Sequence, residues 1–138
     1  MVAPAIQPAA GFTLVELAVV CAMVGVLTAV ALPSFQSYLL RSGRADAVDA
    51  LTRLQMAQAR YHAAHGLYAT QLSVLHGVPQ PDSAQGLYTL AVAGGGDGYR
   101  ATAVAQGRQR NDSECSVLSV EVAQGFTHHG PSARCWNR

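Results

Sequence analysis

Hydrophobic residues are unevenly distributed along this chain, and the pattern changes near residue 40. Residues 17–40 form a run of 24 uncharged residues, mostly Ala, Val and Leu. As a helix the run would extend about 36 Å at about 1.5 Å per residue, enough to span a bilayer. Apolar residues then recur at helical spacing from 41 to 65, and Gly66 is a suitable stop. The pattern predicts one helix over residues 12–65.

The second half of the chain has the shorter periodicity of strands. Residues 87–92, 99–104 and 116–122 are strand-like, and the glycine-rich residues 94–98 between the first two predict a hairpin. The loop over 67–85 contains Pro79 and Pro81, with a short helical turn expected near 71–75. The expected fold class is α+β, in which a long N-terminal helix packs on a small antiparallel sheet.

Charge follows the same division. The 138 residues carry nine basic and eight acidic side chains, a net charge of +1, and only 12% are charged. Within residues 1–40 the one charged residue is Glu16. The length excludes a multi-domain enzyme, the many aliphatic residues argue against disorder, and the net charge alone does not favour a polyanionic partner.

The residues at the start of the apolar run help to distinguish a secretory signal peptide from a segment that stays on the mature chain. A secretory signal peptide has small residues after its apolar region, but here Ala9, Ala10 and Gly11 precede it. Cleavage after Gly11 would leave the apolar helix on the mature chain, with a new α-amino group on Phe12. Glu16, at the head of an apolar helix, needs a cationic partner, and the nearest is this amine or that of a neighbouring subunit. A generic membrane anchor remains the alternative.

Residues 11–17, Gly-Phe-Thr-Leu-Val-Glu-Leu, resemble the signal of type IV prepilins and pseudopilins. The resemblance implies that a prepilin peptidase cleaves after Gly11 and methylates the amine of Phe12, and that Glu16 neutralises the N-terminus of a neighbour during assembly. Gly25 and Pro33 fall where type IV pilins have residues flanking the helix stretch that loosens in the filament.

The same resemblance implies three parts of the chain. Residues 1–11 are a leader peptide, residues 12–40 are the apolar half-helix of the membrane and the filament core, and residues 41–138 are a periplasmic or surface globular domain. The leader contains no Lys or Arg, whereas Arg41 and Arg44 follow the apolar run. Because basic residues favour the cytoplasmic side, we expect a start codon further upstream with basic residues after it.

Three cysteines are present. Cys21 lies within the apolar run, which leaves Cys115 and Cys135 for a disulfide or, less favourably, for metal binding with His128 and His129. The pattern around the two C-terminal cysteines resembles the end of minor pilins of the PilE and ComP type, in which a disulfide closes the D-region. The resemblance is looser here, because Ser116 stands where the pattern has glycine.

Four arginines near the C-terminal cysteines could form a basic stripe that contacts phosphates of duplex DNA. These are Arg108, Arg110, Arg134 and Arg138. A solvated surface is the alternative, since Asp112 and Glu114 dilute the charge. The histidines have no recognisable nucleophile arrangement, and the glycine run lacks the residues of a phosphate loop, so no catalytic residue, metal or cofactor is expected.

The sequence thus predicts a structural subunit of a type IV pilus, a minor pilin that resides in the inner membrane before assembly and in the extracellular pilus afterwards. Implied partners are other pilin subunits, prepilin peptidase and the inner-membrane assembly platform. Implied roles are pilus assembly, twitching motility, adhesion or DNA uptake. The alternatives are a DNA-uptake receptor of the ComP type, a type II secretion pseudopilin and, without a catalytic constellation, an enzyme. Major pseudopilins tend to have calcium ligands in their C-terminal loop. The pseudopilin is less favoured here because Glu121 is the one carboxylate between the two C-terminal cysteines.

Overall fold

The structure, a computed structural model, describes residues 11–136. It separates into two compact units that divide between Ser37 and Tyr38. Helix α1 (Leu14–His65) begins in the first and ends in the second, which confirms the predicted helix with a start two residues later. The start has a local cause: the Thr13 side-chain oxygen accepts a hydrogen bond from the backbone N–H of Glu16 (3.2 Å), so Thr13 is the N-cap.

The first unit consists, over its described residues, of the apolar part of α1. Residues 11–37 are all exposed. Hydroxyl groups within the run are bonded to carbonyls of the helix itself, as Thr28 Oγ1 is to Val24 O (2.7 Å) and Ser34 Oγ to Ala31 O (2.9 Å). Among the described helices, α1 is long and apolar enough to cross a membrane, with a mean hydropathy of 2.4 over its most apolar stretch. A signal sequence would pass the same test.

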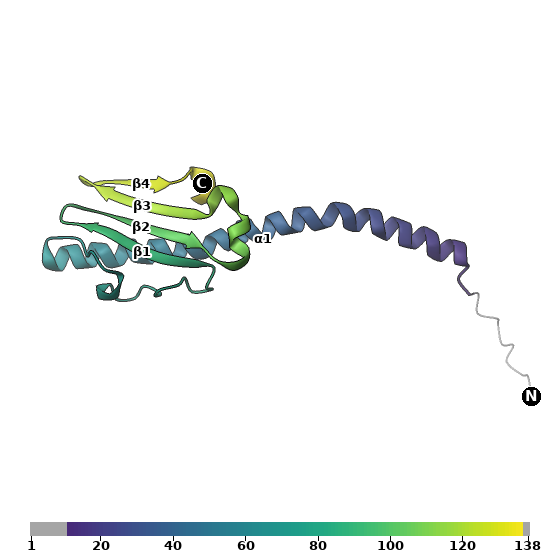
Figure 1. The fold of residues 1–138 in the computed structure, drawn as a ribbon, viewed down its shortest axis with the longest axis horizontal. Coiled ribbons are helices and arrows are strands. Elements are labelled where there is room, and N and C mark those ends of the chain that lie inside the picture. The colour runs from purple at the N-terminus through teal and green to yellow at the C-terminus, as the bar shows by residue number, and fades with distance from the viewer. Residues whose placement is uncertain (1–10, 137–138) are drawn as a thin grey trace, which may run out of the picture. The chain divides into compact units, whose positions relative to one another are not determined.

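The second unit contains a four-stranded antiparallel sheet in the order β1-β2-β3-β4. The strands are β1 (Tyr88–Gly95), β2 (Gly98–Ala105), β3 (Val117–Ala123) and β4 (Phe126–Gly130). Figure 1 shows the strands running beside the second half of α1. The three predicted strands and the hairpin are confirmed, and the short helical turn near residue 71 is η1 (Leu72–Val74).

Strand β4 was missed by the sequence analysis. Its residues are mostly exposed and do not alternate between apolar and polar, so hydrophobic periodicity gives no signal for it. The glycine in the turn before β4 could have indicated a hairpin. Gln124 and Gly125 both have positive φ (51° and 80°) between the paired Ala123 and Phe126, which is the backbone of a two-residue hairpin turn that favours glycine.

The core of the second unit lies between α1 and one face of the sheet. The helix contributes small and aliphatic side chains, and the strands contribute Tyr88, Leu90, Tyr99, Ala101, Ala103, Leu118 and Val120. Buried Asp46 of α1 ties down the loop before β1, because its carboxylate accepts hydrogen bonds from Ser83 Oγ and from the backbone N–H of Leu87 (3.3 Å). The loop that precedes the sheet is therefore attached to the helix by polar as well as apolar contacts.

Candidate functional site

The N-terminal candidate residues stand at the head of α1. Phe12 precedes the helix, with its side chain 83% exposed. Glu16 is the third residue of α1, and its backbone N–H donates to the side-chain oxygen of the N-cap residue Thr13 (3.2 Å). Gly25 and Pro33 both lie inside the continuous helix.

The C-terminal candidate residues are held by short helical turns joined by a disulfide. Cys115 of η3 (Ser113–Cys115) is bonded to Cys135 of η4 (Ala133–Trp136), with 5.5 Å between their Cα atoms. The indole N–H of Trp136 donates to the carbonyl of Gly130 (2.8 Å), which fastens η4 to the end of β4. The disulfide-closed C-terminal region of the predicted fold is confirmed.

A buried ion pair attaches this region to α1. Arg44 donates from Nε and Nη2 to the two carboxylate oxygens of Asp112 (2.7 and 2.9 Å), and both side chains are less than 10% exposed. The hydrogen bond with Asp112 is the main reason that the pKa of Arg44 lies above its ordinary value. Asp112 is therefore the partner of a helix residue and not a surface charge that dilutes a basic stripe.

The helix is also contacted by a second polar side chain of the same segment. Gln109 of η2 (Gly107–Asn111) is fully buried and donates from Nε2 to the carbonyl of Leu40 (2.8 Å). A Cβ atom placed on Gly43 would lie 2.2 Å from Oε1 of Gln109. Glycine at this helix position therefore allows η2 to approach the backbone of α1.

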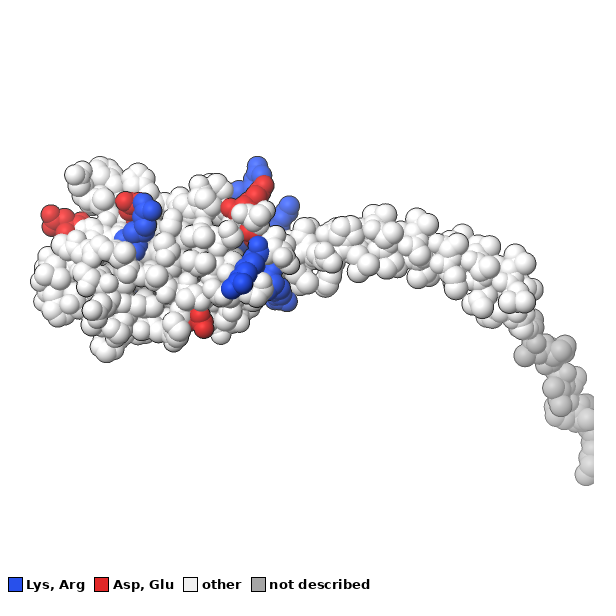
Figure 2. All heavy atoms as spheres, viewed as in Figure 1, with Lys and Arg blue, Asp and Glu red and all other residues white. Residues whose placement is uncertain are grey.

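The arginines of the predicted basic stripe are separated into two groups. Arg108 and Arg110 lie on η2 and are exposed. Arg134 of η4 lines a hollow of about 530 Å³ together with Arg41, Arg44 and Glu114. Figure 2 shows basic side chains gathered at one end of the second unit, with acidic groups among them. Arg138 falls outside the described residues, and the two helix arginines beside Arg134 were not part of the predicted stripe.

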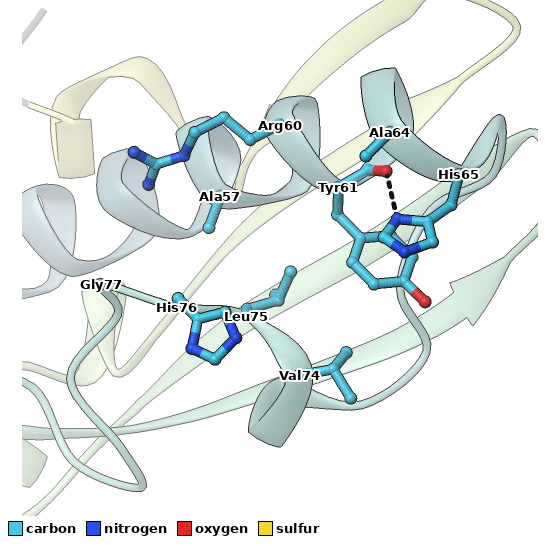
Figure 3. Close-up of a pocket in the computed structure, with 9 residues that line it drawn as sticks. All are labelled: Ala57, Arg60, Tyr61, Ala64, His65, Val74, Leu75, His76 and Gly77. Carbon is cyan, nitrogen blue, oxygen red and sulfur yellow. Dashed lines mark hydrogen bonds between the residues drawn. The ribbon is translucent and has the colours of Figure 1, made fainter.

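A second hollow of this unit is lined by histidine, tyrosine and arginine side chains, residue types that catalysis can use. It measures about 640 Å³ and lies between the end of α1 and residues 74–77. Figure 3 shows Tyr61 stacked on His65 on one side of it and His76 on the other, and the two stacked ring centroids are 4.1 Å apart. The lining is mostly apolar, with Arg60 as its one arginine. These side chains do not pair a nucleophile with a base.

The remaining histidines are engaged in aromatic contacts or exposed. His62 stacks on Tyr68 with 4.4 Å between ring centroids, and His129 contacts Trp136 edge-on at 4.5 Å. Over residues 11–136 no group of three or more His, Cys, Asp or Glu side chains is arranged to hold a metal ion.

Comparison with known proteins identifies the class. A model described as the prokaryotic N-terminal methylation motif matches residues 7–32. Together with the α+β fold, the long apolar helix and the C-terminal disulfide, this motif defines a type IV pilin. A second model, described as "Type IV minor pilin ComP, DNA uptake sequence receptor", matches residues 33–119, well over half of the chain. The chain belongs to this family of type IV minor pilins.

The curated proteins that this chain matches over part of its length are pilins and fimbrial proteins. The chain is 37% identical over 82 residues to the type IV major pilin protein PilE of Neisseria gonorrhoeae, covering 59% of this chain and 48% of that protein. It is 32% identical over 84 residues to the type IV major pilin protein PilA of Myxococcus xanthus, covering 61% and 38%. The chain therefore spans about half or less of the length of the curated relatives it matches.

Proposed function

We propose that this chain is a minor structural subunit of a type IV pilus that is cleaved after Gly11 and methylated on Phe12. The supporting observation is the match of residues 7–32 to the methylation motif at the head of an uncharged, exposed helix. In this proposal residues 1–11 are the leader, residues 12–40 hold the chain in the inner membrane, and the domain from 41 to 138 is periplasmic until assembly.

The same helix would then build the filament. Its apolar surface suits both lipid and the interior of a filament made of equivalent helices, since either environment removes the side chains from water. We assign Glu16 to pairing with the N-terminus of a neighbouring subunit. Gly25 and Pro33 would permit loosening between them, because glycine and proline weaken helix hydrogen bonding. Other pilin subunits, prepilin peptidase and the inner-membrane assembly platform are the proposed partners.

The experiment that tests this role follows a processing-deficient variant. Replacing Gly11 by leucine should leave the full-length chain in the envelope and remove it from filaments sheared off the cell surface, and inactivating the prepilin peptidase should do the same to the unaltered chain. Immunoblots of the two fractions measure the outcome. A Gly11→Leu chain found at normal levels in sheared filaments would contradict the proposal.

Duplex DNA is a second candidate partner, favoured by the description of the matched family and by the exposed arginines on η2. Each phosphate contact releases counterions, so binding should weaken steeply as the salt concentration rises. Every arginine that contacts a phosphate should lower the slope of log affinity against log salt by about 0.9 when replaced. This role would add DNA uptake to the proposed roles of the pilus in motility and adhesion.

We expect a variant with alanine at Arg108, Arg110, Arg134 and Arg138 to bind labelled duplex more weakly than the unaltered chain and with a smaller salt slope. The matched control replaces Arg53 and Arg60 by alanine. These two arginines lie on α1, beyond the residues that contact the C-terminal turns, and Arg53 is paired with Asp49 (2.8 Å). Titration of labelled duplex with each chain at two salt concentrations measures the affinity and the salt slope. Equal affinity and slope in the quadruple variant would leave these arginines as a solvated surface.

A further inference from the structure

The hollow lined by Arg41, Arg44, Arg134 and Glu114 lies close to the end of the apolar run. Arg41 follows Leu40 directly, and Arg44 lies three residues further on, about 4.5 Å along the helix at about 1.5 Å per residue. A headgroup layer is about 5–8 Å thick on each side of a hydrocarbon core of about 30 Å. When residues 17–40 fill the core, as the proposed function requires, both arginines therefore stand at the level of the lipid headgroups.

An aromatic side chain marks the same level. Tyr38 is 66% exposed on α1, two residues before the end of the apolar run. Tyrosine is enriched where membrane helices pass through the interface between hydrocarbon and water. Its position supports placing the membrane surface near residues 38–41.

The fold brings a third arginine to this level from the far end of the chain. Arg44 Nη1 donates to the backbone carbonyl of Arg134 at 3.3 Å, although 90 residues separate them in sequence. The disulfide of Cys115 and Cys135 and the indole bond of Trp136 hold η4 in this place. Arg134 is thus positioned by contacts that η4 makes with distant parts of the chain.

The charges around the hollow leave an excess of positive charge. Arg44 is already paired with Asp112. Within residues 11–136 the guanidinium groups of Arg41 and Arg134 have no hydrogen bond or ion pair, and Glu114 is the acidic residue that lines the same hollow. Two free arginines and one carboxylate suit a ligand with one negative charge. Guanidinium groups bind phosphate oxygens through paired N–H donors.

We propose that this hollow binds the phosphate of an anionic phospholipid, such as phosphatidylglycerol, while the subunit is anchored in the membrane. The proposal rests on the membrane-anchored stage of the proposed function. Lipid is favoured over DNA as the ligand of this hollow because Arg41 adjoins the apolar run, where the headgroup layer is the nearest source of phosphate. It also gives a partner to arginines that lie on the side of the membrane that basic residues otherwise avoid.

The chain offers a built-in probe. Trp136 is the one tryptophan in the sequence and lies two residues from Arg134. The full chain is reconstituted into phosphatidylcholine vesicles that contain a small, equal fraction of phosphatidylglycerol or phosphatidylcholine carrying a nitroxide near the headgroup. Quenching of Trp136 fluorescence then reports which lipid collects beside η4. Each arginine near an anionic surface should raise the preference for phosphatidylglycerol about fivefold at low salt.

The variant combines Arg41→Gln with Arg134→Gln. It keeps the backbone carbonyl that Arg44 contacts and the buried pair of Arg44 with Asp112, so the fold should be retained. The expected result is loss of the preference in this variant, with the preference kept in a matched control that combines Arg53→Gln and Arg60→Gln. Equal quenching by the two lipids in the unaltered chain, or an unchanged preference in the variant, would overturn the proposal.

Flotation with vesicles and binding to duplex DNA distinguish failure of the lipid site from failure of the proposed function. If the unaltered chain does not float with the vesicles, the membrane-anchored stage is wrong and the lipid site is rejected with it. If it floats without lipid preference, only the lipid site is rejected. A variant that loses binding to labelled duplex DNA while keeping the lipid preference would assign the two arginines to DNA and overturn the proposal.

Discussion

Replacing Glu16 by alanine should reduce the amount of this chain in sheared filaments by about tenfold or more, while its amount in the membrane stays the same or rises. A carboxylate in hydrocarbon costs about 3 kcal/mol unless it is paired, so its removal eases insertion. The same removal abolishes the attraction that would align each new subunit with the N-terminus of a neighbour. Immunoblots of filament and membrane fractions from the same cells measure both effects.

The capping geometry supplies the controls for this prediction. Glu16→Gln keeps the size of the side chain and its hydrogen-bonding oxygen but removes the charge, and it should assemble as poorly as the alanine variant. Thr13→Ala removes the hydrogen bond to the N–H of Glu16 and keeps the carboxylate, so it should still assemble. Normal assembly of Glu16→Gln, or an equal defect in Thr13→Ala, would show that capping and not charge is the function of Glu16.

Replacing Asp112 by alanine should lower the free energy of unfolding of the second unit by about 3–5 kcal/mol. The reason is that Arg44 would remain buried without its carboxylate, and an uncompensated buried charge is strongly destabilising. Replacing both Arg44 and Asp112 by apolar residues of similar size should recover part of the loss. Thermal or urea unfolding of the detergent-solubilised chain, followed by Trp136 fluorescence, measures the change.

The neighbouring acidic residue is the control. Glu114 is exposed, and Glu114→Ala should change the free energy of unfolding by no more than about 0.5 kcal/mol. If Asp112→Ala were no more destabilising than Glu114→Ala, the ion pair would not be what attaches the C-terminal region to the helix.

The elements that could be predicted from the sequence are those with local signals. Helix α1 follows from an uncharged run continued by helical periodicity, and strands β1 and β2 follow from β-rich segments on either side of a glycine turn. Strand β4 could not be predicted from periodicity, since its exposed Phe126 and His128 show no buried face. Its place at the edge of the sheet depends on pairing with β3, and the residues of β4 by themselves do not indicate that pairing.

The candidate sites divide in the same way. The motif around Gly11 and Glu16 is contiguous, so it could be found by inspection. The ion pair of Arg44 with Asp112 joins residues 68 positions apart, and the hydrogen bond from Arg44 to the carbonyl of Arg134 joins residues 90 positions apart. Contacts made across such separations depend on the complete fold. For this reason Asp112 was interpreted as a surface charge, and Arg41 and Arg44 were not included with Arg134.

The most direct test of the whole account is the mass of the N-terminal peptide of this chain in filaments sheared from the cell surface. A processed pilin predicts a chain that begins at Phe12 and carries one methyl group on its α-amino nitrogen. An intact leader before Gly11, or cleavage beyond the apolar run near residue 40, would contradict it.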